Sequence, residues 1–426
     1  MAKGITIIGL GSGDPKQLTL EAWQVLEEAE EIYLRTSRHP AASHLPKHLA
    51  LHSFNRLCEG KNPDEAYNEI AHRIVELGGR PQGVVYAVPG HPLVDASTQR
   101  IMAMAEEKGL KVRIIRGMSF LESALTHLGL DPLDGLQVVD ATKLAAQHYP
   151  HLDPNLPVLV ARLRSRPLAS SVKLTLMNLY PDEHLVTLVR EAGTNEERVW
   201  TTPLCELGSQ EGLDHSTSLY LPPLTTPGSL TSLQDVVARL RAPGGCPWDR
   251  EQTHRSLRPE LLEETYEVLE ALDAGDVDKL CEELGDLLLE VVFHIQLAAE
   301  AGEFKLPQVI EGIVTKLKHR HPHVFGEVKV TGASEVLRHW EEIKREERGG
   351  KGSALDGVPR TLPALARAQD LQRRAARVGF DWPYVEGVLA KVAEEVQELK
   401  EAAGKEKQEE ELGDLLFSLV NLARWL

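Results

Sequence analysis

The sequence predicts a multidomain protein in which a two-lobed α/β half is followed by an all-α bundle of two helical repeats. In the first half, short apolar runs that end at glycine alternate with amphipathic stretches, which is the pattern of an α/β sheet. After a proline-rich segment at residues 220–230, charged stretches follow whose apolar residues recur with helical period. The letters EELGDLL then occur twice, at residues 282–288 and 410–416.

Composition narrows the class of protein. The chain of 426 residues is long enough for two or three domains of about 150 residues. Its 64 acidic and 47 basic residues leave a net charge of −17, which argues against non-specific binding to nucleic acid or anionic membranes and permits a cation site. The four widely spaced cysteines predict a cytoplasmic protein without disulfides. We expect no membrane partner, because no apolar run reaches the roughly 18 residues of a membrane span.

The first half, residues 1–223, is expected to form one α/β domain with two lobes. The expected strands lie in GITIIGLG (4–11), GVVYAVPG (83–90), KVRIIRG (111–117), LPVLVARL (156–163) and HLVTLVREAG (184–193), with helices at 18–31 and 63–77 among them. A segment rich in proline, aspartate and asparagine at 148–157 predicts the boundary between the lobes.

The second half predicts helices throughout. They are expected at residues 232–241, 257–274, 277–301, 307–319, 334–348, 362–378, 385–403 and 407–426. The glycine- and proline-rich segment 348–363 divides them into a first repeat, residues 230–348, and a second repeat, residues 361–426.

Both repeats carry the pattern Glu-Glu-x-x-Glu on one helix and Glu-x-x-Asp on the next. Its members are Glu263, Glu264, Glu267, Glu283 and Asp286 in the first repeat, and Glu394, Glu395, Glu398, Glu411 and Asp414 in the second. Spacings of three and four place side chains on one helical face, and the short connections predict antiparallel partners. Such helix faces are usually solvated surface. Here the pattern occurs twice, and each aspartate precedes an apolar run, so we expect a site for Mg²⁺ or Mn²⁺ rather than Zn²⁺.

Residues 233–426 resemble the MazG nucleoside triphosphate pyrophosphohydrolases. The resemblance rests on GGCPWDREQTH (244–254), LLEETYEVLEAL (261–272), KHRHPHVFGEV (318–328), VGFDW (378–382) and the repeated EELGDLL. It implies a tightly packed homodimer and Mg²⁺-dependent hydrolysis of a nucleoside triphosphate to a monophosphate and pyrophosphate. On this reading Glu264, Glu267, Glu283 and Asp286 are metal ligands, as are Glu395, Glu398, Glu411 and Asp414, with Glu263 and Glu394 as candidate catalytic bases.

Which repeat carries the chemistry stays open. The resemblance favours the second and implies a further helix with lysine, arginine and tryptophan contacts, whereas this sequence stops at Leu426. Either the second site is incomplete, or the chain is truncated. The basic residues Lys316, Lys318 and Arg320 are candidates for triphosphate contacts. Zinc binding by the neighbouring histidines 319, 321 and 323 is disfavoured, because Pro322 interrupts the helix and no cysteine is near.

Three loops follow expected strands of the first half. They hold Gly9, Gly11, Gly13 and Asp14; then Gly90, His91 and Pro92; then Gly117 through Ser119 and Phe120. Loops at the carboxyl ends of parallel strands line the usual ligand crevice of such sheets. Residues 4–223 resemble the tetrapyrrole methylases, which bind S-adenosylmethionine between two lobes. The resemblance implies cofactor contacts from Gly90, His91, Pro92, Ser119 and Phe120. Many members have Gly-Asp-Pro where this chain has Gly-His-Pro, which weakens the implication of methyl transfer more than that of binding.

The fused order, methylase-like and then MazG-like, resembles the YabN type of bacterial protein. The leading hypothesis is therefore a house-cleaning nucleotide pyrophosphohydrolase fused to a methylase-like domain. A competing hypothesis is an S-adenosylmethionine-dependent methyltransferase whose helical half serves dimerisation or nucleotide sensing. Other all-α pyrophosphohydrolases share paired carboxylate helices, and the flanking motifs make them less favoured. The preferred base and sugar stay open.

Overall fold

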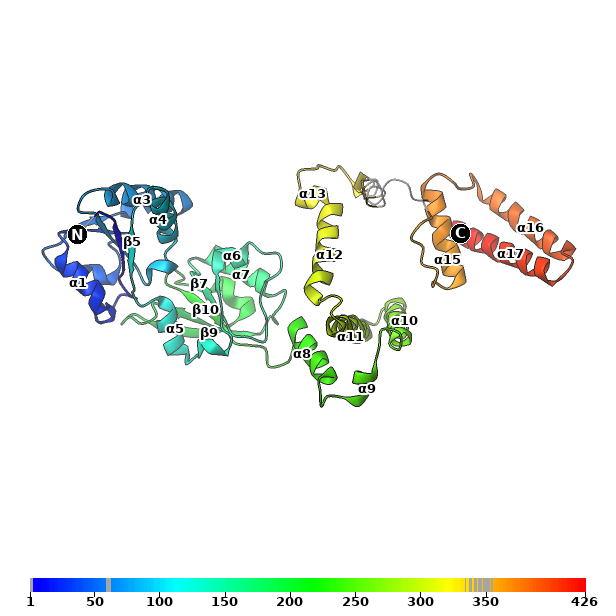
Figure 1. Ribbon diagram of the computed structural model, residues 1–426, viewed down its shortest axis with the longest axis horizontal. Coiled ribbons are helices and arrows are strands. Elements are labelled where there is room, and N and C mark those ends of the chain that lie inside the picture. Colours follow the sequence, from blue (N-terminus) through cyan, green and yellow to red (C-terminus); the bar gives the residue numbers. More distant parts are fainter. Residues whose placement is uncertain are drawn as a thin grey trace. The chain divides into compact units, whose positions relative to one another are not determined.

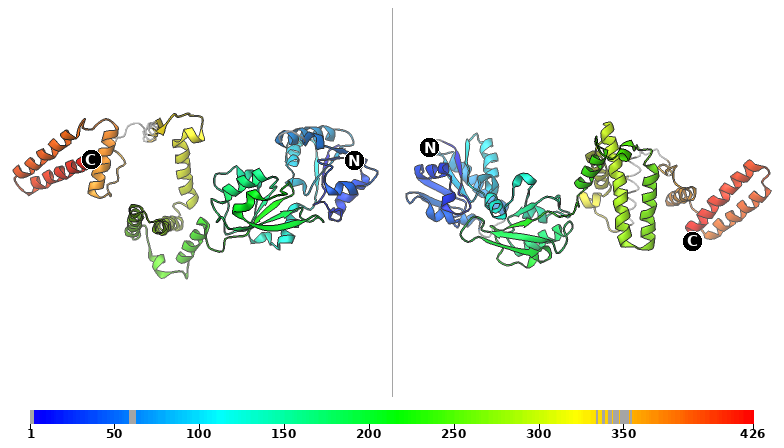
Figure 2. Two further views of the ribbon diagram at one scale, coloured as in Figure 1. Left: turned by 180° about the vertical axis from the view of Figure 1, so that it is seen from behind. Right: turned by 90° about the horizontal axis from the view of Figure 1, so that it is seen from below.

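The computed structural model describes residues 3–58, 63–333, 335–336, 339–340, 343, 347, 353 and 355–426. The chain divides into two compact units, Met1–Leu297 and Ala298–Leu426, and each is described by itself. Figures 1 and 2 follow the elements along the chain by colour. Within the described residues, no helix combines the length and apolarity that crossing a membrane requires.

The first sheet is entirely parallel. Its strands are β1 (Ile5–Gly9), β2 (Glu31–Leu34), β3 (Ala50–Ser53), β4 (Val84–Val88) and β5 (Val112–Ile115), in the order β3-β2-β4-β1-β5. Helix α1 (Leu20–Glu28) packs on one face, while α3 (Pro63–Gly78) and α4 (Ala96–Glu107) pack on the other (Figure 1). Because β4, β1 and β5 are neighbours, the loops at their carboxyl ends share one edge of the sheet.

The second sheet is mixed. Its strands are β6 (Gln137–Asp140), β7 (Val158–Ala161), β8 (Leu185–Arg190), β9 (Arg198–Pro203) and β10 (Ser218–Leu221), in the order β6-β7-β10-β8-β9. Only β6 and β7 pair in parallel. Helix α7 (Arg166–Leu176) packs with α6 (Ala141–Ala145) in the core of this lobe, and α5 (Phe120–Leu128) lies between the last strand of the first sheet and the first strand of the second.

The expected lobe boundary at 148–157 is wrong. That segment connects α6 to β7 inside the second lobe, and the change of sheet falls between β5 and β6. Proline and asparagine mark any surface loop, so their presence could not distinguish a connection within a lobe from one between lobes. All five expected strands are present as β1, β4, β5, β7 and β8. The other five strands were missed, because several are four-residue segments with polar letters, such as the exposed β3.

The helical part of the first unit contains α8 (Leu230–Arg241), α9 (Pro247–Glu251), α10 (Arg258–Ala274) and α11 (Val277–Ala301). A small core of Val237, Leu257, Val292, Phe293 and Leu297 joins α8 to α11. Helix α10 ends at Gly275, whose φ of 66° lies in the left-handed region, and the chain reverses there. The expected helices at 232–241, 257–274 and 277–301 are confirmed, the last with identical bounds.

The second unit contains α12 (Leu306–Arg320), α13 (Pro322–Phe325), α15 (Ala364–Arg377), α16 (Val385–Glu401) and α17 (Lys405–Trp425). Helices α16 and α17 form an antiparallel hairpin that reverses between residues 402 and 404, and α15 packs on α17 (Figure 1). The expected helices at 307–319, 362–378, 385–403 and 407–426 are confirmed within about three residues. The one expected at 334–348 lies largely outside the described residues.

Candidate functional site

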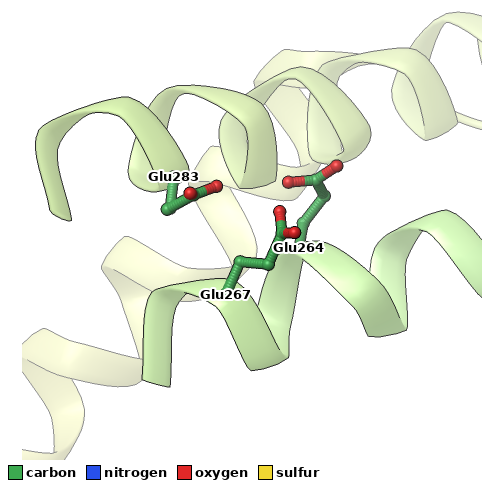
Figure 3. A group of neighbouring side chains, drawn as sticks. All are labelled: Glu264, Glu267 and Glu283. Atoms are coloured by element: carbon green, nitrogen blue, oxygen red, sulfur yellow. The ribbon is translucent and has the colours of Figure 1, made fainter. Parts of the chain in front are cut away.

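Three carboxylates of the first repeat converge on one point, and we call Glu264, Glu267 and Glu283 the first cup. Glu264 and Glu267 are one turn apart on α10, and Glu283 projects from α11 toward them (Figure 3). One oxygen from each residue lies within 4.8 Å of the other two. The antiparallel reversal at Gly275 is what brings the two helix faces together. The cup therefore offers three oxygen donors to one cation.

Negative charge accumulates in the first cup. Burial, followed by the charges of Asp286 and Glu267, raises the pKa of Glu264. Burial and the neighbouring Glu267 likewise raise the pKa of Glu283, whose nearest cation is Lys279, with Nζ 3.8 Å from Oε1. The Oε2 atom of Glu264 is buried and has no hydrogen-bond partner. A buried carboxylate oxygen without a partner is costly, so this donor set fits a hard divalent cation.

The second repeat builds a similar arrangement, and we call Glu395, Glu411 and Asp414 the second cup. Glu395 lies on α16 and the other two on α17, again with oxygens within 4.8 Å of one another. A lysine enters this cup: Lys391 Nζ lies 2.8 Å from Glu395 and 3.0 Å from Glu394. These hydrogen bonds raise the pKa of Lys391. Part of the negative charge of the second cup is thus balanced by the chain itself.

The residue of the first repeat that corresponds to Lys391 is an acid, Glu260. Glu260 precedes Glu264 by four residues, as Lys391 precedes Glu395. Similarly, Glu290 follows Asp286 by four residues, where the second repeat has Ser418 after Asp414. The Oε2 atoms of Glu260 and Glu290 are buried without hydrogen-bond partners. Sequence reasoning missed both acids, although aligning the two repeats position by position would have found them.

Several other expected residues occupy the edges of the cups. Asp286 lies close enough to raise the pKa of Glu264, and Glu398 has its own pKa raised by burial and by Glu395 and Glu411. Of the candidate bases, Glu263 is exposed on α10, whereas Glu394 is held by Lys391. Each expected ligand thus lies on its expected helix, and the structure brings three of them together in each repeat. Their roles as ligands and bases stay predictions.

The basic residues of α12 divide into two kinds. Lys316 and Lys318 are exposed. Arg320 donates to both oxygens of Glu347, at 3.2 Å from Nε and 2.5 Å from a terminal nitrogen. This pairing lowers the pKa of Glu347. Among the described residues, the histidines near Arg320 join no cluster of potential metal ligands, so zinc gains no support there.

In the first half, three glycines build a backbone cradle at the carboxyl ends of β1, β4 and β5. A Cβ atom on Gly9 would lie 2.4 Å from the carbonyl oxygen of Gly90, and one on Gly117 would lie 2.5 Å from the same atom. The Gly90 amide donates to the Gly11 carbonyl at 2.7 Å. Backbone meets backbone with no room for side chains, which makes these glycines necessary to the loops.

The cradle opens into a cleft of about 920 Å³ lined by both lobes. Of the expected cofactor contacts, Gly90, His91, Ser119 and Phe120 line it, while Pro92 is buried and does not. Two non-glycine residues on the second-lobe side, Arg162 and Glu191, have φ values of 62° and 51°. Left-handed backbone at non-glycine residues is strained and is concentrated at functional sites. The cleft is therefore the candidate ligand site of this half.

Two of these side chains, His91 and Ser119, form hydrogen bonds to the backbone of their own loops. His91 Nδ1 accepts a hydrogen bond from the Leu93 amide at 3.2 Å, which starts a 3₁₀ turn as an aspartate would. The Ser119 hydroxyl accepts from the Leu121 amide at 3.1 Å, and the Ser119 amide donates to Oε2 of Glu122 at 2.8 Å, which together form the capping box of α5. Histidine can thus replace the aspartate of Gly-Asp-Pro without loss of the turn.

Comparison with known proteins gives two family matches. Residues 4–208 match the tetrapyrrole (corrin/porphyrin) methylases, and residues 252–325 match the MazG nucleotide pyrophosphohydrolase domain. The uncharacterized protein YabN of Bacillus subtilis (strain 168) is 41% identical over 437 residues, covering 100% of this chain and 88% of the relative.

Two further relatives match the helical half. A nucleoside triphosphate pyrophosphohydrolase of Escherichia coli (strain K12) is 52% identical over 202 residues, covering 46% of this chain and 77% of the relative. The nucleoside triphosphate pyrophosphohydrolase/pyrophosphatase MazG of Thermotoga maritima is 49% identical over 195 residues, covering 46% of this chain and 75% of the relative.

Proposed function

Because the chain belongs to the family in which a tetrapyrrole methylase-like domain is fused to a MazG nucleotide pyrophosphohydrolase domain, we propose that it hydrolyses nucleoside triphosphates. The reaction would convert a nucleoside triphosphate and water to a monophosphate and pyrophosphate, with Mg²⁺ or Mn²⁺ as the cofactor. Two relatives of the helical half carry the name of this activity.

The first cup is the observation that carries the proposal. Its three carboxylates lie within 4.8 Å of one another, and the buried Oε2 of Glu264 has no partner. Together with the adjacent Asp286, these residues would hold the cation. A divalent cation supplies charge neutralisation on phosphate oxygens and lowers the pKa of water.

Other side chains would complete the reaction. Glu263 is exposed one residue from Glu264, so its carboxylate is free to accept the proton of the attacking water. The exposed Lys316 and Lys318 of the second unit stay candidates for triphosphate contacts. Arg320 could join them only by giving up its pair with Glu347.

We place the chemistry in the first repeat. The MazG match covers residues 252–325, which contain the first cup. In the second cup Lys391 balances part of the charge through Oε1 of Glu395, although Oε2 of Glu395 is buried without a partner, as Oε2 of Glu264 is. Glu395, Glu398, Glu411 and Asp414 stay candidate ligands there, with Glu394 as the candidate base.

Pyrophosphate release from a mixed pool of ribo- and deoxyribonucleoside triphosphates with Mg²⁺ tests the proposal. Glu264→Gln removes a charge without changing shape, and we expect it to lower the rate by on the order of 100-fold. Glu395→Gln should retain most activity, and Glu282→Gln is a matched control on an exposed neighbour. Loss in the Glu395 variant alone would move the chemistry to the second cup, and no release by the unchanged, folded chain would contradict the proposal.

The N-terminal half supports a second proposal, that the cleft binds S-adenosylmethionine. A cradle of closely packed glycines and a cleft of about 920 Å³ at the carboxyl ends of parallel strands suit a small-molecule cofactor. Methyl transfer would make this half an enzyme in its own right. The helical half would then serve for dimerisation or nucleotide sensing.

A homodimer is also proposed. Leu284, Leu288 and Val291 form an exposed apolar stripe along α11, and α17 repeats it with Leu412, Leu416 and Leu419. An apolar stripe with helical spacing is typical of a helix that packs on a partner. Light scattering on the purified chain measures the mass directly, and a monomer would contradict this proposal. Cytoplasmic location likewise stays a proposal.

A further inference from the structure

The acidic face of the first hairpin continues one helical turn beyond the first cup. Helices α10 and α11 run antiparallel, and the cup fixes which turns face each other, because Glu264 and Glu267 meet Glu283 there. One turn further along, toward the start of α10 and the end of α11, stand Glu260 and Glu290. The repeated acidic pattern contains neither residue, yet both share the helix faces that build the cup.

Three neighbouring carboxylates here each bury an oxygen that has no hydrogen-bond partner. They are Oε2 of Glu260, Glu264 and Glu290. Glu290 is only 8% exposed, and burial, followed by the charges of Glu260 and Glu264, raises its pKa. Within the described part of the chain, no donor reaches these three oxygens. The group is therefore negative, packed together and without a positive partner of its own.

Such a group needs positive charge from elsewhere. Burial without a partner is costly for a carboxylate, and neighbours of like charge increase the cost. The second repeat has Lys391 and Ser418 at the two corresponding positions, so it has fewer acids and one more base there. In the first repeat Lys279 contacts Glu283, at the opposite end of the acidic face. A shared proton would neutralise one carboxylate, whereas a divalent cation would serve all three.

We propose that Glu260 and Glu290 hold a second divalent cation, Mg²⁺ or Mn²⁺, one helical turn (about 5.4 Å) from the first cup, with Glu264 shared between the two sites. Glu260 and Glu264 are half-buried and Asp286 beside them is exposed, so this face of the hairpin is open to solvent. A cation can therefore enter from that side.

The spacing of the three carboxylates suits a partly hydrated ion. Among the described residues, they are not gathered as closely as the first cup, whose oxygens lie within 4.8 Å of one another. Mg²⁺ usually keeps several waters and takes one or two carboxylates. Beside the first cup, a second cation would neutralise further phosphate oxygens of a triphosphate, and this role alone rests on the proposed function.

Titration of the full chain with Mn²⁺, followed by electron paramagnetic resonance of the free ion, counts the bound cations. All variants carry Glu395→Gln and Glu411→Gln, which remove two acids of the second cup, so that the count refers to the first repeat. This background chain is expected to bind two Mn²⁺, and adding Glu290→Gln or Glu260→Gln should leave one. Glu282→Gln, at an exposed position of α11, is the matched control and should still bind two.

The outcomes separate the second cation from the proposed function. A background chain that binds one Mn²⁺, unchanged by Glu290→Gln and Glu260→Gln, overturns the second cation and leaves the first cup standing. Folded glutamine variants that bind none show that all these acids form one site, which also overturns it. Pyrophosphate release is measured separately, so a chain that binds two Mn²⁺ without hydrolysing nucleotides contradicts only the proposed function. No Mn²⁺ binding by the background chain overturns both cation sites.

Discussion

Lys391 Nζ lies 2.8 Å from Oε1 of Glu395, inside the second cup. The corresponding residue of the first repeat is Glu260, whose Oε2 is buried without a partner. Two cups built from the same pattern of acids therefore differ in charge at this position, and again where Glu290 of the first repeat corresponds to Ser418 of the second. Lys391 lies within hydrogen-bond distance of the second cup, whereas in the first cup Lys279 Nζ lies 3.8 Å from Oε1 of Glu283. This difference can be tested from both sides.

Placing a lysine in the first cup should impair cation binding. Glu260→Lys puts a positive charge beside Glu264, and Coulomb repulsion of a divalent cation is expected to weaken Mn²⁺ affinity by about 10-fold or more. Titration of Mn²⁺ followed by electron paramagnetic resonance measures this. Asp273→Lys makes the same charge change at an exposed position of α10 and should have little effect. Equal loss in both variants would point to net charge rather than to the cup.

Removing the lysine from the second cup should make the stability of this hairpin depend on a bound divalent cation. Lys391→Met keeps the length of the side chain and leaves Glu394 and Glu395 without their nearest cation. We expect the melting temperature to fall in EDTA and to recover with Mg²⁺. Lys400→Met, on an exposed face of α16, is the control. A variant that melts at the same temperature with and without Mg²⁺ would contradict the prediction.

The metal-free first cup should become less stable as pH rises. The folded-state pKa of Glu264 and of Glu283 is raised by burial and by neighbouring carboxylates, so the folded chain binds more protons than the unfolded chain. Stability is then full below the ordinary value of 4.5 and is lost as pH rises through the raised pKa. Hydrogen exchange of α10 amides in EDTA at pH 5 and pH 7.5 measures this, and Glu264→Gln should flatten the difference.

His39 should act in the opposite direction. Its pKa is lowered to about 4 from 6.5, so the unfolded chain binds more protons between these values, and stability falls as pH drops through this window. The contribution lost between pH 7 and pH 5 is about 2 kcal/mol. Hydrogen exchange of β1 and β4 amides measures the unfolding free energy of the first lobe. His39→Gln cannot titrate there, so a variant with the same pH dependence as the unchanged chain would refute the assignment.

The sequence by itself determined the local elements and the faces they present. The helical period places Glu264 and Glu267 on one face and Glu283 and Asp286 on another, and the bounds of α11 follow from the apolar pattern alone. Glycine after apolar strands likewise predicted the loops at Gly90 and Gly117. These features depend on backbone geometry over a few neighbouring residues, so the local amino-acid sequence is enough to predict them.

Tertiary structure decided which of these groups meet and in what state. Packing within each hairpin places Lys391 beside Glu395 in the second cup and leaves one oxygen of Glu264 and one of Glu395 buried without a partner, and folding of the first lobe buries Nδ1 of His39. Strand pairing shows that the lobe boundary lies in the connection between β5 and β6, and not at the expected residues 148–157. Burial, hydrogen-bond pairing and strand order depend on contacts between distant residues, and a local pattern carries no record of them.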